Sequence, residues 1–84
     1  MSSVTVTVLF FAKGRELAGV DEHAVTVDAG SKASDVVERI VGIYPALETI
    51  VDSSLLALNL EYCSAETVVS NGDQLALIPP ISGG

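Results

Sequence analysis

The chain has 84 residues, of which 49% are hydrophobic and 18% are charged, and its formal net charge is −7. This length allows one domain, the hydrophobic fraction excludes a disordered chain, and 11 acidic against 4 basic side chains argue against nucleic-acid binding. Its single cysteine, Cys63, excludes an intramolecular disulfide and a cysteine-ligated metal cluster, which favours a reducing, cytoplasmic environment.

The N-terminus and the apolar runs give no targeting or membrane signal. The first three residues carry no basic side chain and lead directly into a strand-like segment. We therefore expect neither a signal peptide nor a transit peptide. The longest apolar runs are far shorter than a membrane span, so we expect no transmembrane helix.

Residues 4–12 predict a first β-strand with two different faces. The residues expected to point toward the core are Val4, Val6, Val8 and Phe10, and those on the other face are Thr5, Thr7, Leu9 and Phe11. Leu9 and Phe11 therefore lie on the threonine side. Either another segment covers them or they form an exposed apolar patch.

A short helix and a second strand are expected next. Residues 15–18 are compatible with a short helix, which Gly19 can end by adopting the left-handed conformation. A second strand is expected at about residues 23–28, with Val25 and Val27 facing inward.

The main helix is predicted from about residue 32 to residue 43. Ser31 is a suitable N-cap, and Asp35 lies near the positive end of the helix dipole. The apolar face at helical spacing consists of Ala33, Val36, Val37, Ile40, Val41 and Tyr44. Pro45 ends the helix, and residues 46–51 allow one further turn.

The last third of the chain is again strand-like. Residues 54–63 predict two short strands with a reversal at residues 59–61, and residues 71–73 (Asn-Gly-Asp) form a clear turn. The final strand covers residues 74–78, with Leu75 and Leu77 facing the core and Ile78 on the opposite face. The two prolines that follow stop strand pairing because proline donates no backbone N–H.

The element order β-β-α-β-β-β predicts an α+β fold. One main helix would cover one face of a mixed sheet of about five strands, as in a compact β-grasp domain. We expect this domain to span residues 1–78 and a flexible C-terminal tail to span residues 79–84.

No enzyme or metal-binding pattern is present in the sequence. His23 is the only histidine, and we expect it to be a strand residue near the surface. We expect Cys63 to be a small, half-buried hydrophobe because no base or motif lies near it in sequence. The carboxylates lack metal-ligand spacing and no glycine-rich nucleotide loop occurs, so we expect no metal site and no bound cofactor.

The C-terminal tail carries the strongest functional pattern. It consists of Pro79, Pro80, Ile81, Ser82, Gly83 and Gly84. The prolines favour an extended exit, and six extended residues reach about 20 Å. Two glycines without side chains can thread a narrow channel and present a free carboxylate, which stays inert until an enzyme activates it. The alternative is an ordinary frayed terminus.

Two motifs resemble a known family. Residues 9–19 read L-F-F-A-x-x-R-E-L-x-G, and the second half contains L-A-L-N at residues 56–59, N-G-D at 71–73 and I-P-P-I-S-G-G at 78–84. Together they resemble the small, sulfur-carrying subunits of molybdopterin synthase, a family of ubiquitin-like β-grasp sulfur carriers. The resemblance covers nearly the whole chain, although residues 20–54 match in pattern only.

The resemblance implies a carrier chemistry at Gly84. An E1-like enzyme would use ATP and magnesium to adenylate its carboxylate, and a sulfur donor would convert the acyl-adenylate to a thiocarboxylate. The tail would then enter the large synthase subunit, where sulfur passes to cyclic pyranopterin monophosphate to build the molybdopterin dithiolene. The resemblance also implies a heterotetramer of two small and two large subunits, with the active site on the large subunit.

Partner contacts are implied at matching positions. Arg15 resembles the residue that pairs with the activating enzyme, and Phe11, Tyr62 and Ile78 fall where relatives place apolar groups against their partners. Strand parity puts Leu9 with Phe11, so we expect one exposed apolar patch beside the tail. The alternative for Phe11 is a second small core under the Arg15 loop.

Two other functions stay open from the sequence. The chain could be a related sulfur carrier for thiazole synthesis, tRNA thiolation or protein modification, although ubiquitin-type modifiers tend to have a basic residue before Gly-Gly, where this chain has Ile81 and Ser82. It could also be a binding module whose tail has no chemistry.

Overall fold

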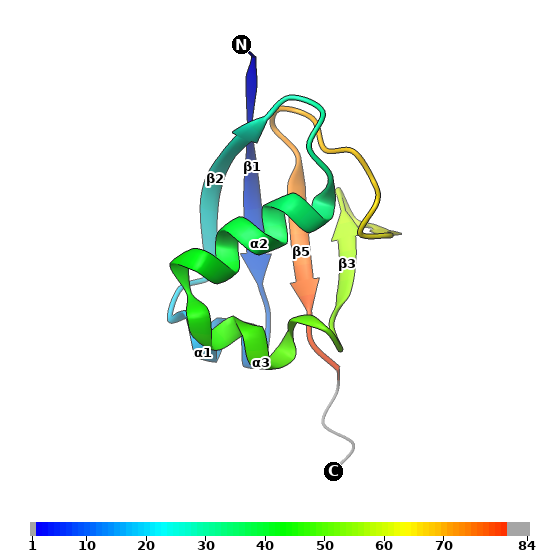
Figure 1. Ribbon diagram of the computed structural model, residues 1–84. Coiled ribbons are helices and arrows are strands. Elements are labelled where there is room, and N and C mark those ends of the chain that lie inside the picture. The colour runs from blue at the N-terminus through cyan, green and yellow to red at the C-terminus, as the bar shows by residue number, and fades with distance from the viewer. Residues whose placement is uncertain (1, 81–84) are drawn as a thin grey trace.

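A five-stranded mixed sheet with one main helix across one face forms the protein, as the computed structural model shows for residues 2–80 (Figure 1). The elements in chain order are β1 (Ser3–Phe10), α1 (Lys13–Ala18), β2 (Glu22–Asp28), α2 (Ala33–Ile43), the 3-10 turn η1 (Pro45–Leu47), α3 (Glu48–Val51), β3 (Leu55–Leu58), β4 (Glu61–Cys63) and β5 (Gln74–Ile78). The predicted order of strands around a single main helix is confirmed.

The strand order is β2-β1-β5-β3-β4, which brings the first and last strands together at the centre. β1 and β5 run parallel, whereas the β1–β2, β3–β5 and β3–β4 pairs are antiparallel. The predicted α+β class with a mixed sheet is therefore confirmed. Because β5 lies beside β1, the end of the last strand is close to the end of the first.

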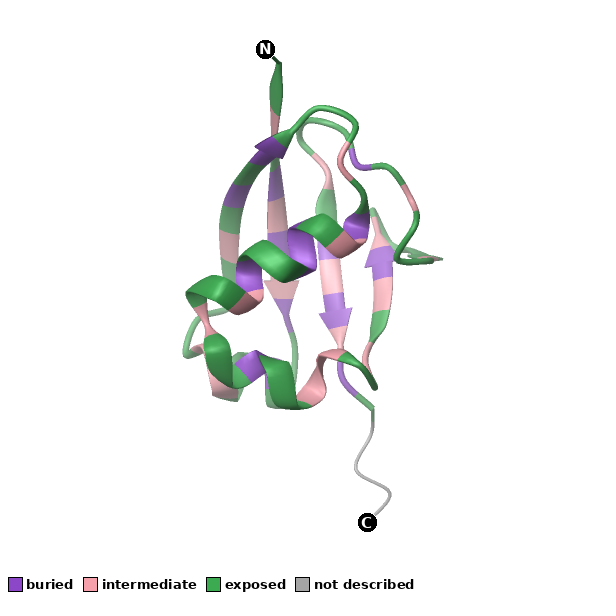
Figure 2. Ribbon diagram, viewed as in Figure 1, coloured by how far each residue is buried: buried purple, intermediate pink, exposed green. Residues whose placement is uncertain are grey.

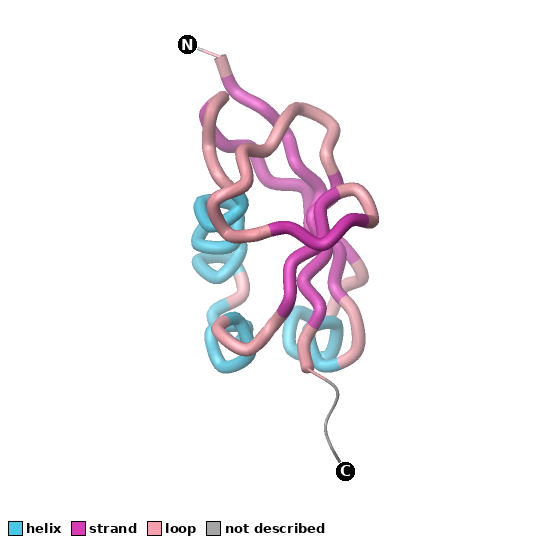
Figure 3. The backbone as a smooth tube through the Cα atoms, turned by 90° about the vertical axis from the view of Figure 1, so that its right-hand side faces the viewer, coloured by secondary structure: helices cyan, strands magenta, loops and turns pink. Residues whose placement is uncertain are grey.

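The hydrophobic core lies between α2 and the sheet (Figures 2 and 3). The predicted inward-facing strand residues that are buried are Val6, Val8, Phe10, Val25, Val27, Leu75 and Leu77. From α2, Ala33, Val36, Val37 and Ile40 complete this core, while Val41 and Tyr44 are half-buried against it. The predicted helical and strand periodicities thus point to the correct faces.

The start of α2 corrects one sequence prediction. Ser31 is not the N-cap, because the helix starts one residue later and Lys32 holds that position. Carbonyl oxygens of a distant loop accept the first helical N–H groups, Ala33 N to Thr67 O at 2.7 Å and Ser34 N to Ala65 O at 2.9 Å. These tertiary bonds satisfy the donors that a serine side chain would otherwise satisfy.

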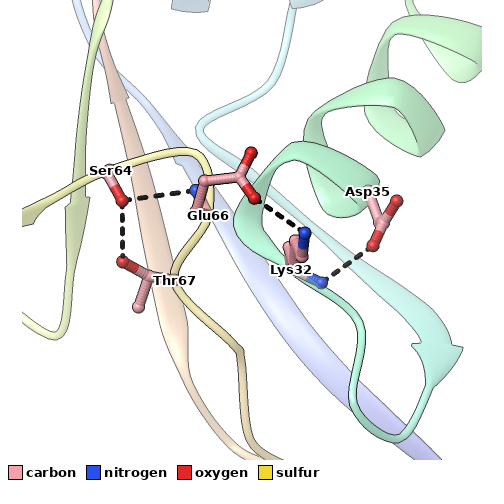
Figure 4. A network of polar contacts seen from close by, with 5 residues as sticks. All are labelled: Lys32, Asp35, Ser64, Glu66 and Thr67. Atoms are coloured by element: carbon pink, nitrogen blue, oxygen red, sulfur yellow. Dashed lines mark hydrogen bonds and ion pairs between the residues drawn. The ribbon is translucent and has the colours of Figure 1, made fainter.

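A polar network fastens the same loop to the helix (Figure 4). Lys32 Nζ donates to Glu66 Oε2 at 2.7 Å, and the Lys32 backbone N–H donates to Asp35 Oδ2 at 2.8 Å. The hydrogen bond to Glu66, followed by the charge of that carboxylate, raises the pKa of Lys32 above its ordinary value. Because both side chains are exposed, this pair orients the loop more than it stabilises the fold.

Replacement of Ile40 by alanine tests the placement of the core. Ile40 is fully buried, so Ile40→Ala should lower the free energy of unfolding by about 2–5 kcal/mol through lost burial and a cavity. Ile43 lies on the same helix with 42% of its surface exposed, and Ile43→Ala should cost less than about 1 kcal/mol. Urea unfolding measures both, and equal losses would contradict this packing.

Candidate functional site

One row of side chains crosses four neighbouring strands on the face opposite α2. Leu9 of β1 pairs with Ala76 of β5, Ala76 pairs with Ala57 of β3, and Ala57 pairs with Tyr62 of β4. Residues paired across strands project from the same face of a sheet. The two alanines in the middle are small, so they form a hollow between the larger side chains of Leu9 and Tyr62.

This hollow is an apolar groove of about 240 Å³. It is lined by Leu9, Phe11, Ala57, Leu60, Tyr62, Gln74, Ala76 and Ile78. We call these eight residues the outer groove. The structure thus brings together the four apolar residues that the sequence analysis places at a partner contact, namely Leu9, Phe11, Tyr62 and Ile78. Since Phe11 is 46% exposed and lines the groove, it does not belong to a second core.

Sequence reasoning missed the floor and one rim of the outer groove. Ala57 is buried, yet it does not belong to the core beneath α2. Its side chain lines the groove, whereas its sequence neighbours Leu56 and Leu58 pack toward the core on the other face. Strand parity could have placed Ala57 on this face. Leu60 lies in a turn, where no periodicity indicates the direction of a side chain.

The β3–β4 turn that carries Leu60 is fastened to the start of β5. The Asn59 side chain donates to Asp73 Oδ1 at 3.0 Å and accepts from the Gln74 backbone N–H at 3.0 Å. The Asn59 backbone N–H also donates to Gln74 O at 2.9 Å. These three bonds hold the rim of the outer groove in a defined position relative to its floor.

Arg15 lies on α1 and is not part of the outer groove. Gly19 ends this helix in the left-handed conformation, with φ +78°, and its N–H donates to Arg15 O at 2.8 Å, as the sequence predicts. The Arg15 guanidinium is exposed and lies 3.6 Å from Asp21 Oδ1. Such an exposed pair is weak, so Arg15 can exchange Asp21 for a carboxylate on another protein.

The outer groove ends where the C-terminal segment begins. Ile78 is both the last residue of β5 and a lining residue of the groove. Pro79 is buried and Pro80 is exposed, whereas Ile81, Ser82, Gly83 and Gly84 lie outside the described residues. The six residues printed after Ile78 would span about 20 Å if fully extended.

His23 and Cys63, the other chemically reactive side chains considered above, make structural contacts within the domain. His23 Nδ1 and the Tyr44 hydroxyl share a hydrogen bond of 2.8 Å, which ties β2 to the end of α2. Cys63 is half-buried against the core, as expected. Within residues 2–80, no three histidine, cysteine or carboxylate side chains gather as a metal site, and no helix is long and apolar enough to cross a membrane.

Comparison with known proteins identifies the family. The chain belongs to the ThiS family, which matches residues 8–84. It is 42% identical to the molybdopterin synthase sulfur carrier subunit of Arabidopsis thaliana, over 99% of this chain and 86% of that protein. It is 46% identical to the corresponding subunit of Anopheles gambiae, over 98% of this chain and 94% of that protein. The resemblance to this carrier family is therefore confirmed.

Solved structures agree on the fold. SAMP1 from Haloferax volcanii is 33% identical with a TM-score of 0.89, covering 95% of this chain and 99% of that one. A ubiquitin from Caldiarchaeum subterraneum is 13% identical with a TM-score of 0.66, covering 99% and 100%. A chain of a complex of subunits 1 and 2 of molybdopterin-converting factor from Helicobacter pylori is 21% identical with a TM-score of 0.67, covering 96% and 100%. The predicted ubiquitin-like β-grasp fold is confirmed.

Proposed function

We propose that this chain is the sulfur carrier subunit of a molybdopterin synthase and that the carboxylate of Gly84 is its reactive group. The observation that carries the proposal is the outer groove, an apolar groove that ends at Ile78, directly before the Pro-Pro-Ile-Ser-Gly-Gly segment. Relatives at 42% and 46% identity along nearly the whole chain are sulfur carrier subunits of this synthase, which supports the same assignment.

The chemistry starts with activation of the Gly84 carboxylate. An E1-like enzyme binds ATP and magnesium, and a carboxylate oxygen attacks the α-phosphate, so that pyrophosphate leaves and an acyl-adenylate forms. Hydrosulfide, supplied by a sulfur donor, then attacks the acyl carbon and displaces AMP. A carbon–sulfur bond thereby replaces a carbon–oxygen bond, and the product is a thiocarboxylate.

Transfer takes place on a second protein. The large synthase subunit receives the tail, and the thiocarboxylate sulfur forms a bond to cyclic pyranopterin monophosphate. Water then cleaves the bond between this sulfur and the acyl carbon of Gly84, which leaves the sulfur on the pterin and restores the carboxylate for another cycle. Two charged chains supply the two sulfurs of the molybdopterin dithiolene. We propose a heterotetramer of two small and two large subunits in the cytoplasm. The Helicobacter pylori complex of subunits 1 and 2 supports the large subunit as partner.

This chain contributes binding and reach rather than acid–base catalysis. Of the outer-groove residues, only Gln74 and Tyr62 carry polar side-chain atoms, so the lining is almost wholly apolar. The groove therefore serves to hold a partner by apolar contact while the tail enters its active site. Arg15 offers a separate charged contact, which we assign to the activating enzyme.

Intact-mass measurement tests the activation step. The purified chain is incubated with its activating enzyme, ATP, magnesium and a sulfur donor. We expect a mass increase equal to replacing one oxygen by sulfur, which fragmentation places on Gly84, and no increase when ATP is omitted. An unchanged mass with enzymes that charge a known carrier would contradict the proposed function.

The related carriers and the inert binding module are not favoured by the curated relatives, which are synthase subunits. Addition of the large subunit and the pterin substrate to the charged chain should reverse the mass increase. A carrier for thiazole synthesis or tRNA thiolation would keep its sulfur in this mixture, and an inert module would never acquire it.

A further inference from the structure

Backbone strain in this protein gathers at the outer groove. Among residues 2–80, only three non-glycine residues have positive φ: Ala12 at +48°, Asn59 at +51° and Leu60 at +73°. Ala12 follows the groove residue Phe11 on one side, and Asn59 and Leu60 form the turn on the other side. Strained backbone of this kind concentrates at functional sites, where the surrounding structure holds it in place.

Leu60 is the least expected of the three. It is the second residue of a two-residue hairpin turn, since Leu58 pairs with Glu61 across it. Positive φ at both turn residues is the pattern of a type I′ turn, whose second position strongly favours glycine. Asparagine tolerates this conformation, whereas a leucine side chain clashes with its own backbone there. Asn59 thus fits its position and Leu60 does not.

Folding gives no reason for a leucine at position 60. Its side chain is 94% exposed, so it buries almost no surface within the chain. A residue that strains the backbone and packs on nothing weakens the domain, and an exposed leucine beside other exposed apolar side chains also promotes association. The Asn59 hydrogen bonds hold the backbone of this turn at the groove rim, so the exposed Leu60 side chain is available for a contact outside the chain.

We propose that Leu60 is an anchor for the large synthase subunit and a determinant of which large subunit this chain accepts. The protruding Leu60 side chain enters an apolar recess of that subunit, while an apolar side chain of the partner fills the hollow over Ala57 and Ala76. This inference rests on the proposed function and adds a recognition residue to it.

The apolar character of this rim favours the large subunit over the activating enzyme. Binding energy at a protein interface concentrates in a few buried anchors, and apolar side chains gain most from being buried there. The exposed Arg15 provides a separate charged contact, which suits steering of the carrier toward the activating enzyme. Leu60 lies in the β3–β4 turn at one end of the sheet, whereas α1, which carries Arg15, connects β1 and β2 at the other end.

Replacement of Leu60 by glycine separates binding from stability. Leu60→Gly relieves the positive-φ strain, so we expect the melting temperature to stay the same or rise by up to about 5 °C. The dissociation constant for the large subunit should rise at least about tenfold. Leu60→Met, which keeps an apolar side chain of similar size, should bind within about threefold of the unaltered chain.

The matched control removes an exposed apolar side chain elsewhere. Val68 is exposed and lies outside the outer groove, so Val68→Ala should leave the affinity for the large subunit unchanged. Calorimetric titration against the large subunit, and separately against the activating enzyme, measures each variant. We expect Leu60→Gly to lose affinity for the large subunit and to keep its affinity for the activating enzyme.

Three results would overturn the inference about Leu60. The first is an unchanged affinity of Leu60→Gly for the large subunit. The second is a melting temperature of Leu60→Gly that is lower by more than about 5 °C. The third is a loss of affinity for the activating enzyme alone. Failure of the proposed function looks different, because the unaltered chain would then not bind the large subunit or gain sulfur at all. That result would overturn both.

Discussion

A chain extended by one alanine after Gly84 should lose sulfur transfer while its unfolding transition stays unchanged. The extension moves the terminal carboxylate about 3.5 Å farther from the domain. It also gives the terminal residue a methyl group, which a terminal glycine lacks. A displacement of even 1 Å at a reacting centre can cost roughly 100-fold in rate, so we expect at least that loss. All the buried core residues lie between Val6 and Leu77, so the fold should not respond.

The matched control for this extension adds one alanine before Met1. Thermal unfolding and single-turnover transfer from an enzymatically charged chain measure both variants. Normal transfer by the C-terminally extended chain would show that the position of the carboxylate does not matter, and the carrier mechanism would then be wrong.

A charge in the outer groove should abolish partner binding with little effect on stability. Phe11→Asp places a carboxylate where the complex excludes water, and an unpaired buried charge costs several kcal/mol, so binding to the large subunit should weaken by roughly 100- to 1000-fold. Because Phe11 is already half exposed in the free chain, unfolding should change by about 1 kcal/mol or less.

Val20→Asp is the control for charge alone. Val20 is exposed and lies outside the outer groove, so an added carboxylate there should leave affinity for the large subunit within about twofold. Calorimetric titration compares the two variants. If Phe11→Asp and Val20→Asp bind alike, the outer groove is not the docking surface.

The parts of the fold that local patterns determine were predictable from sequence. Alternation in β1 identified both the buried Val6, Val8 and Phe10 and the outward-facing Leu9, because side chains on a strand alternate strictly between faces. The same reasoning placed Ile78 on the outer face of β5. Because β1 and β5 are neighbours, these outward residues meet in one groove.

The features that sequence reasoning missed depend on tertiary contacts. Ser31 has the side chain of an N-cap, but carbonyls from residues 65 and 67 satisfy the helix start, and only the folded chain brings that loop to the helix. Leu60 gives no sequence signal because side chains in a turn follow no periodicity, and the second position of a type I′ turn strongly favours glycine over leucine.

Transfer of labelled sulfur from Gly84 tests the central claim most directly. The chain is charged with heavy-isotope sulfur, purified, and mixed with the large subunit and cyclic pyranopterin monophosphate in a single turnover. The carrier mechanism predicts that the label leaves Gly84 and enters the pterin at the same rate, one sulfur per charged chain, so that two charged chains are consumed for each dithiolene. Label that remains on Gly84, or that enters solvent without labelled pterin, would contradict the assignment of this chain as the sulfur donor.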